Sequence, residues 1–210
     1  MVNGGRVGLL SHQHEMIKME KNAKIILASS SPRRKQILEN MGLSFEIIPS
    51  DYEENLDSNE FSYEKIEDFA CKKAGAVLDK VDKNSLIIGA DTIVVLENEV
   101  LGKPQDEKEA LNMLTRLSGK RHFVVTSVCV LRTKDLKKLV KSTTSFVEFE
   151  KLRPDMIESY VQKYGPLDKA GAYGIQELPE GFVKSIEGSF ENIIGLCPEA
   201  VKDLLNEIEK

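Results

Sequence analysis

Short apolar runs alternate with helical patterns along most of this chain. Residues 24–28, 44–49 and 86–96 read as strands, because each is a brief apolar run bounded by polar or turn-forming residues. Segments 122–131 and 140–149 are rich in valine, threonine and phenylalanine, and they can pair as neighbours across the charged turn 134–138. These segments predict a sheet that includes at least one hairpin.

Apolar residues at helical spacing separate these strands. We expect helices over residues 32–41 and 62–78, around Ala110, Met113, Leu114 and Leu117, around Ile157, Tyr160, Val161 and Tyr164, and around Val201, Leu204, Leu205 and Ile208. Helices that alternate with strands favour an α/β fold with a mixed sheet. No repeat or low-complexity linker divides the chain, so we expect a single domain over residues 24–210.

Composition narrows the class of protein. Hydrophobic residues make up 41% and charged residues 30%, as in ordinary soluble proteins. The net charge of -5 gives no broad positive surface, which argues against stable nucleic-acid binding and requires any phosphate to be held locally. The longest apolar tract, 86–96, is too short for a membrane span of roughly 20 residues.

The cysteines and residues 1–23 indicate the cellular compartment in which we expect the protein. Cys71, Cys129 and Cys197 are odd in number and far apart in sequence, which argues against a disulfide framework or a zinc site and favours a reducing cytoplasm. Residues 1–23 lack the sustained apolar segment of a signal peptide, so we expect a flexible extension. The sequence leaves open whether this extension is native.

The segment Ser29-Ser30-Ser31-Pro32-Arg33-Arg34 is a candidate anion site. Ser31 is the expected N-cap and Pro32 the first helical residue, which places both arginines in the first turn. Cations there are disfavoured by about 0.3 to 1 kcal/mol each, so an anion should offset them. Serine hydroxyls, free N–H groups and guanidinium groups suit a phosphate. The alternative is an ordinary capped helix whose arginines point into water.

Asp91 interrupts the apolar run 86–96. A buried carboxylate needs a cation, a metal or a hydrogen-bonding partner, and Gly89 and Ala90 leave room for a ligand or another backbone. The alternative is a strand bend in which local backbone groups satisfy Asp91. Lys103, at the turn 102–104, could supply a cation for phosphate or for Asp91, or could be solvated. One carboxylate of the acidic loop 51–60, which contains Glu53 and Glu54, could complete a Mg²⁺ site with Asp91.

Residues 168–176 (DKAGAYGIQ) form a third candidate segment. Its glycines and alanines let backbone approach a ligand closely. Gln176 could offer both amide groups to a pyrimidine edge, and Lys169 could bind phosphate. A tight structural turn is the alternative. The chain has no phosphate loop of the GxxxxGK[ST] type, no GxGxxG and no GxSxG, which argues against standard kinases, GTPases, dinucleotide enzymes and serine hydrolases.

Six segments, together and in this order, resemble motifs of the Maf family: residues 28–34, 89–92, 101–104 and 169–176, with 188–190 and 194–196 near the end. This resemblance covers the chain from about Lys24 to the C-terminus. It implies a nucleoside triphosphate pyrophosphatase whose fold is similar to that of inosine-triphosphate pyrophosphatases: an elongated mixed sheet flanked by helices, with a central cleft between two lobes. The subgroup it most resembles acts on dTTP and UTP. Cys197 departs from the usual Gly-Leu-Pro.

The resemblance also implies roles for individual residues and for partners. Positions associated with substrate choice are Arg33, Thr92 and Gln176, Asp91 matches the proton acceptor, and Ser29, Arg34, Glu54, Lys103 and Lys169 would complete the phosphate and metal shell. The catalytic set is then Asp91, Lys103 and Glu54, with Asp91 and Glu54 as metal ligands. The family suggests a homodimer.

The expected reaction is metal-dependent cleavage of a nucleoside triphosphate to its monophosphate and pyrophosphate. Mg²⁺ or Mn²⁺, held by Asp91, Glu54 and phosphate oxygens, would orient a water toward the α-phosphorus. Asp91 would take the proton of that water directly or would act as a metal ligand, and the sequence does not separate these roles. Alternatives are a pyrophosphatase for 7-methyl-GTP and a nucleotide-binding regulator of septum formation.

Overall fold

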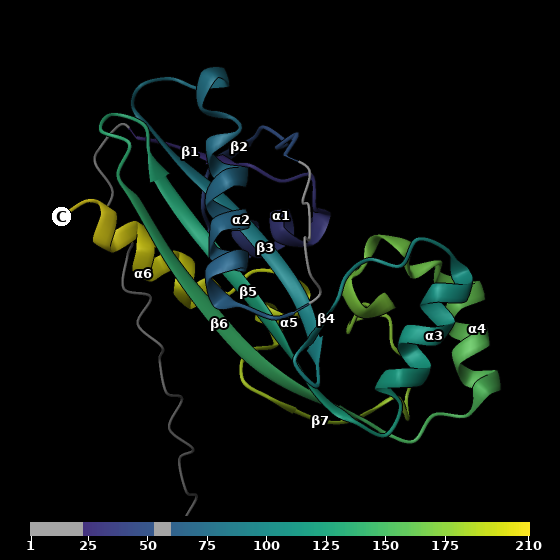
Figure 1. Ribbon diagram of the computed structural model, residues 1–210. Coiled ribbons are helices and arrows are strands. Elements are labelled where there is room, and N and C mark those ends of the chain that lie inside the picture. Colours follow the sequence, from purple (N-terminus) through teal and green to yellow (C-terminus); the bar gives the residue numbers. More distant parts are fainter. Residues whose placement is uncertain (1–22, 53–59) are drawn as a thin grey trace, which may run out of the picture.

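A mixed sheet of seven strands forms the centre of the computed structural model, which describes residues 23–52 and 60–210 (Figure 1). The strands are β1 (Lys24–Leu27), β2 (Phe45–Ile47), β3 (Ser85–Leu96), β4 (Glu99–Leu101), β5 (Arg121–Arg132), β6 (Lys138–Phe149) and β7 (Val183–Glu187). Their order is β2-β1-β3-β5-β6-β7, with β4 also paired to β3. β1 is parallel to β2 and β3, and the other pairings are antiparallel.

Helices cover both faces of this sheet. They are α1 (Pro32–Asn40), α2 (Tyr63–Gly75), α3 (Glu107–Leu117), α4 (Pro154–Tyr164), α5 (Phe190–Ile194) and α6 (Pro198–Ile208), with 3₁₀ turns η1 (Leu78–Lys80), η2 (Pro166–Asp168) and η3 (Ala170–Ala172). In β1, Ile25 and Leu27 pack with side chains of α1 and α6, whereas Ile26 packs with α2 on the opposite face. This alternation follows from the two-residue period of a strand.

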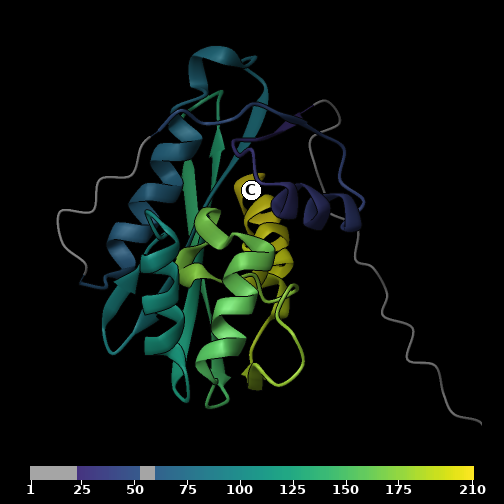
Figure 2. The ribbon, with the colours of Figure 1, turned by 90° about the vertical axis from the view of Figure 1, so that its right-hand side faces the viewer.

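The other end of the sheet has its own helices. α3 and α4 lie side by side there (Figure 2), and their apolar faces share a core with the far ends of β3, β5 and β6. Two helix-covered halves thus share one elongated sheet. The expected α/β fold and the mixed sheet flanked by helices are confirmed. The expected long strands and helices are present within a few residues, but β4, β7 and α5 were not expected.

One edge of β3 is interrupted between the two halves. β1 pairs with β3 only as far as Leu27 opposite Ile88, and β4 pairs with β3 only over Val94 to Leu96. β5 pairs with the opposite edge of β3 without interruption from Leu86 to Val95. Positions 89–93 therefore have a strand partner on one edge only, among the strands that the structure describes. This gap opens the middle of the sheet to the space between the halves.

α2 crosses β3 at close range because of a glycine. A Cβ atom at Gly89 would collide with the carbonyl oxygen of Ala70 and would lie 2.6 Å from the backbone nitrogen of Ala74. Of the two uses expected for the space beside Gly89, the structure shows the second, the approach of another backbone. The close crossing fixes the position of α2 relative to the residues that follow Gly89.

The same crossing brings two cysteines together. Cys71 of α2 and Cys129 of β5 have their sulfur atoms 2.7 Å apart, although they are distant in sequence. Both are free thiols, as is Cys197. Separation along the sequence was therefore a poor guide to their separation in space.

Two other expectations concern the first 23 residues and the absence of a membrane-spanning helix. The flexible extension expected over residues 1–23 lies, apart from Ala23, outside the described residues. Across residues 23–52 and 60–210, no helix combines the length and apolar character needed to cross a bilayer.

Candidate active site

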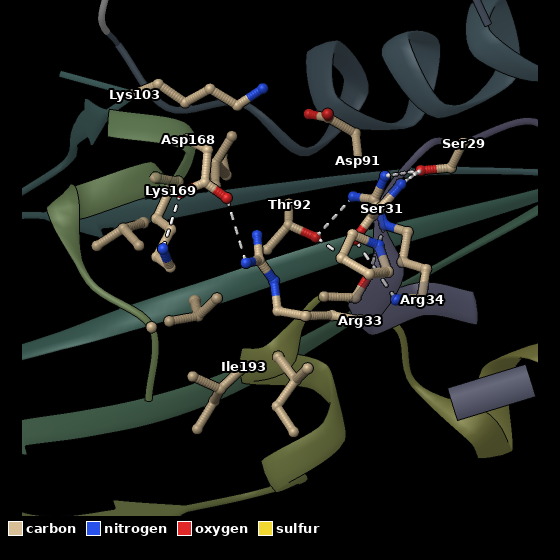
Figure 3. Close-up of a pocket in the computed structure, with 18 of the residues that line it drawn as sticks. Ser29, Ser31, Arg33, Arg34, Asp91, Thr92, Lys103, Asp168, Lys169 and Ile193 are labelled. Carbon is tan, nitrogen blue, oxygen red and sulfur yellow. Dashed lines mark hydrogen bonds and ion pairs between the residues drawn. The ribbon is translucent and has the colours of Figure 1, made fainter. Parts of the chain in front are cut away.

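A pocket of about 400 Å³ lies at the gap in the edge of β3 (Figure 3). The residues predicted from sequence that line it are Ser29, Arg33, Arg34, Asp91, Thr92, Lys103, Lys169 and Gln176. Glu54, the remaining predicted site residue, lies outside the described residues. The pocket takes residues from both halves of the molecule, in agreement with a central cleft.

The loop before α1 is organised around serine hydroxyls. Ser31 is the N-cap, and its hydroxyl accepts a hydrogen bond of 3.4 Å from the backbone nitrogen of Arg34. Ser29, largely buried, accepts from the backbone nitrogen of Ser31 at 3.2 Å. Pro32 occupies the first turn, as expected. The positive end of this helix therefore faces the pocket, which favours an anionic ligand.

Arg34 joins three elements through its guanidinium group. It donates to the carbonyl oxygen of Gly195 at 2.9 Å, to the Ser29 hydroxyl at 3.2 Å and to the Thr92 hydroxyl at 3.1 Å. The alternative of an arginine pointing into water is wrong for Arg34. Its contacts hold Ser29 and Thr92 in fixed orientations beside the pocket.

Thr92 belongs to the same hydrogen-bond network. Its hydroxyl lies 3.0 Å from that of Thr126 on β5 and 3.3 Å from the carbonyl oxygen of Gly195. The Thr126 hydroxyl donates in turn to the carbonyl oxygen of Asn192 at 2.9 Å. The network fastens α1 and α5 to the centre of the sheet on the face opposite α2.

Asp91 faces the other side of β3 and meets a lysine from α2. Asp91 is 2% exposed, and its Oδ1 lies 2.5 Å from Nζ of Lys73. A buried carboxylate needs such a partner, since an unpaired charge away from water is costly. The cation that pairs with Asp91 is thus Lys73, and the alternative of purely local backbone partners is wrong.

The second carboxylate oxygen of Asp91, Oδ2, differs from Oδ1 in its surroundings. Oδ2 is buried and has no hydrogen-bond partner among the described residues, although Asp91 lines the pocket. Buried polar atoms are nearly always satisfied, so an orphaned carboxylate oxygen at a pocket calls for a ligand, a metal or water. Carboxylate oxygen suits Mg²⁺ and Mn²⁺, and Asp91 therefore fits a metal-binding role. No cluster of three or more acidic, histidine or cysteine side chains with metal-binding geometry occurs in the described ranges.

Arg33 and Lys169 come from opposite sides of the pocket and share one carboxylate (Figure 3). Arg33 lies 3.3 Å from Oδ2 of Asp168, and Lys169 lies 2.8 Å from Oδ1 of the same residue. Lys169 is largely buried and also lies 3.3 Å from Oε2 of Glu177. Partial burial raises the pKa of Asp168, but Lys169 and Arg33 more than offset it, so the pKa lies below its usual value.

Lys103 and Gln176 carry exposed side chains at the rim of the pocket. Neither has a hydrogen bond or ion pair with another described residue, so both are available to a ligand. Their loops are linked, because Gly171 donates its N–H to the carbonyl oxygen of Gly102 at 3.0 Å. Gly171 has a φ of 67°, and a Cβ there would lie 2.9 Å from Val94. The glycine therefore lets this loop lie against β3.

Comparison with known proteins identifies the family. Residues 24–208 match the model of the family described as "Maf-like protein", which is nearly all of the described chain. The chain belongs to the Maf family.

Several relatives of this Maf protein carry the name dTTP/UTP pyrophosphatase. The one from Ruminiclostridium cellulolyticum is 45% identical over 89% of this chain and 96% of its own length. Those from Desulforamulus reducens and Thermotoga maritima are 43% and 45% identical, over 86% and 82% of this chain and 94% and 83% of their own lengths.

Solved structures give weaker similarity. A nucleoside-triphosphatase (dITP/XTP pyrophosphatase) from Mycobacterium abscessus has a TM-score of 0.44 at 16% identity, and covers 61% of this chain and 75% of its own. The Ham1 protein of Staphylococcus aureus has a TM-score of 0.41 at 14% identity, over 89% and 93%.

Lys73 and Asp168, both in contact with predicted site residues of this Maf protein, were not predicted. Lys73 lies seven positions after Ile66, on the buried face of its helix, and a lysine on an apolar stripe was the signal that could have marked it. Asp168 directly precedes Lys169, but nothing in its spacing indicates that it also reaches Arg33. That contact depends on how the two halves meet.

Proposed function

We propose that this chain is a nucleoside triphosphate pyrophosphatase that cleaves dTTP and UTP to their monophosphates and pyrophosphate, with Mg²⁺ or Mn²⁺. The observation that carries the proposal is the carboxylate of Asp91, which has one oxygen held by Lys73 and the other left unpaired at the pocket. The names of the relatives support the reaction and the pair of substrates.

Phosphate binding falls to the positive groups around Asp91. Arg33, Lys103 and Lys169 line the pocket from three segments, and the N-terminus of α1 adds its free N–H groups. These groups would hold the triphosphate and stabilise negative charge on the leaving pyrophosphate. Arg34 would contribute chiefly by fixing Ser29 and Thr92, because its own donors already contact protein oxygens.

Asp91 would accept the proton of the water that attacks the α-phosphorus. Its Oδ2 is the free oxygen, and the contact between Lys73 and Oδ1 keeps the carboxylate from turning. Asp91 and Glu54, with phosphate oxygens, would hold the divalent ion, which supplies charge neutralisation and Lewis acidity when bound.

The base would be read at the rim of the pocket. Gln176 has a free amide that can pair with the alternating acceptor and donor of a pyrimidine edge. Arg33 and Thr92 would limit the position of the nucleotide relative to Gln176. A larger methylated purine has a different edge, so we expect the pyrimidine nucleotides to be preferred.

A nucleotide panel tests this proposal. Monophosphate and pyrophosphate release would be measured for UTP, dTTP and 7-methyl-GTP, with Mg²⁺, with Mn²⁺ and with a chelator. We expect the pyrimidines to be favoured, the chelator to abolish turnover, and Asp91→Asn to lower kcat by at least about 100-fold. Asp155→Asn, on the exposed start of α4, is the matched control and should behave as wild type. Normal turnover by Asp91→Asn would exclude the assigned role.

A further inference from the structure

Asp168 forms ion pairs with two cations, Arg33 and Lys169, that the proposed function assigns to phosphate binding. Its Oδ2 contacts Arg33 of α1 at 3.3 Å and its Oδ1 contacts Lys169 at 2.8 Å, so each oxygen serves a cation from a different side of the pocket. No other described residue pairs with the Arg33 side chain. This carboxylate provides a negative charge beside the first turn of α1.

The ion pair between Asp168 and Arg33 can be replaced by an ion pair between Arg33 and another anion. The Asp168 side chain is 62% exposed, and an ion pair of that exposure contributes little stability. Lys169 keeps a second partner in Glu177 at 3.3 Å when Asp168 leaves. A polyphosphate, which offers more negative charge and more oxygens than one carboxylate, can therefore displace Asp168 without stranding a buried cation.

We propose that Asp168 is a built-in competitor for polyphosphate, which pairs with Arg33 and Lys169 between turnovers and promotes release of the pyrophosphate product. The inference rests on the proposed function for its role in turnover. It also makes a claim about anion binding alone. In wild type, each anion must break both contacts of Asp168 and then tolerate its negative charge nearby.

Removal of the negative charge of Asp168 should increase the affinity of the pocket for anions. Asp168→Asn keeps the size of the side chain but removes a negative charge within a few ångströms of the anion, which in a partly solvated site corresponds to about a three- to tenfold effect. We expect inorganic pyrophosphate to bind Asp168→Asn about three- to tenfold more tightly than wild type in calorimetry without nucleotide, with a difference that shrinks at high salt. Product inhibition by pyrophosphate should strengthen by the same factor, without a rise in kcat.

Two control variants separate charge from structure. Asp168→Glu keeps the charge and should bind pyrophosphate like wild type, and Asp155→Asn removes an equal charge away from the pocket and should also match wild type. Weaker or unchanged binding by Asp168→Asn would overturn the inference, since Asp168 would then be a support for Lys169. Failure of wild type to bind pyrophosphate would overturn it too. Pyrophosphate binding without nucleotide turnover would instead exclude only the proposed function.

A second inference rests on the two neighbouring thiols. Cys71 is partly exposed on α2, and Cys129 is buried in β5 with its sulfur 2.7 Å away. A disulfide of about 2.05 Å then needs a shift of less than about 1 Å. The contact with Cys129 lowers the pKa of the Cys71 thiol, which favours Cys71 as the attacking sulfur.

We infer that Cys71 and Cys129 form an intramolecular disulfide when exposed to a disulfide oxidant such as oxidised glutathione. The Cys71 thiolate attacks one sulfur of the oxidant and releases one glutathione thiolate. Cys129 then attacks Sγ of Cys71, passes its proton to a glutathione thiolate, and releases the second glutathione. Two protein thiols are oxidised while one glutathione disulfide is reduced to two thiols. The bond would tether α2, which carries Lys73, to the sheet.

Mass spectrometry of alkylated peptides tests this inference on the full chain. After treatment with oxidised glutathione we expect a Cys71–Cys129 linked peptide, an alkylated Cys197, and a melting temperature higher by about 5 °C that dithiothreitol reverses. The Cys129→Ala variant should instead retain glutathione on Cys71 and show no such rise. A lasting glutathione adduct on Cys71 in wild type, or the absence of a Cys71–Cys129 linked peptide, would overturn the inference.

Discussion

Asp91 shows how a charged side chain can stand in the middle of an apolar strand. Its burial would be costly for an unpaired carboxylate, and Lys73 offsets that cost through one close contact from α2. The pair is asymmetric, because Lys73 engages Oδ1 and leaves Oδ2 for the pocket. The same contact therefore offsets the cost of burying the carboxylate and fixes the orientation of Oδ2 at the pocket.

The ion pair predicts coupled effects on stability. Lys73→Met should lower the free energy of unfolding by about 3 kcal/mol, because the buried carboxylate loses its cation. Asp91→Asn combined with Lys73→Met should cost much less than the sum of the single changes, since no charge is then left unpaired. Urea unfolding of the four proteins of this cycle measures the coupling. Additive effects of the two changes would show that the ion pair contributes nothing.

At the scale of elements, α2 and β3 set the geometry of the site. The missing side chain at Gly89 lets the backbone of α2 approach β3, and this approach places Lys73 beside Asp91 two residues further along the strand. The loops that carry Lys103 and Lys169 are fastened to one another and to β3 in a similar way through Gly171. Close packing of backbone thus determines where the charges lie.

Two glycines near this crossing should respond in opposite directions. Gly89→Ala would force a Cβ against the backbone of Ala70 and Ala74, and we expect it to lower the free energy of unfolding by about 3 kcal/mol. Gly75→Ala, at the end of α2, meets nothing within 4 Å and should be neutral or stabilising by up to about 1 kcal/mol. Chemical denaturation of both variants makes the comparison. Equal effects would contradict the packing argument.

The long elements and the short strands β1 and β2 were predictable from apolar patterns, whereas β4, β7, α5 and the non-local contacts were not. The apolar stripe of α6 and the apolar run of β3 are long enough to be recognised in the sequence. β4 has only three residues, too few to show a periodic pattern. The predicted site residues that lie in contiguous motifs line one pocket, except for Glu54, which is outside the described residues. Lys73 and the contact between Arg33 and Asp168 were missed, because each arises only when separate elements pack together.

At the scale of the whole molecule, the two halves share the strands β3, β5 and β6, and each half has a hydrophobic core of its own. His122 lies in the core of the half that contains α3 and α4, where its Nε2 is 2.8 Å from the hydroxyl of Tyr173 and its ring meets Phe149 edge to face. Burial lowers the pKa of His122 to about 4, so the ring is neutral in the folded state at neutral pH. Its protonation is coupled to unfolding of this core.

Stability should therefore fall with acidification in a defined window. In the unfolded chain His122 titrates near its usual pKa of about 6.5, so between about pH 6.5 and 4 the unfolded state binds the extra proton. The contribution of His122 is complete above that window and is lost as the pH falls through it. We expect the loss of unfolding free energy from about pH 7 to 4.5 to be about 2 kcal/mol smaller in His122→Gln than in wild type. Equal losses, measured by urea unfolding, would contradict this.

The sheet remains continuous beside the interrupted edge of β3, and this continuity has a mechanical consequence. β3, β5 and β6 extend from one helix-covered half into the other, so three continuous strands join the halves instead of a flexible linker. Strands joined in this way resist bending, and wide hinge motion of the halves is therefore disfavoured. The pocket is preorganised by the sheet, and a ligand that enters it has only to rearrange the side chains and loops at its rim.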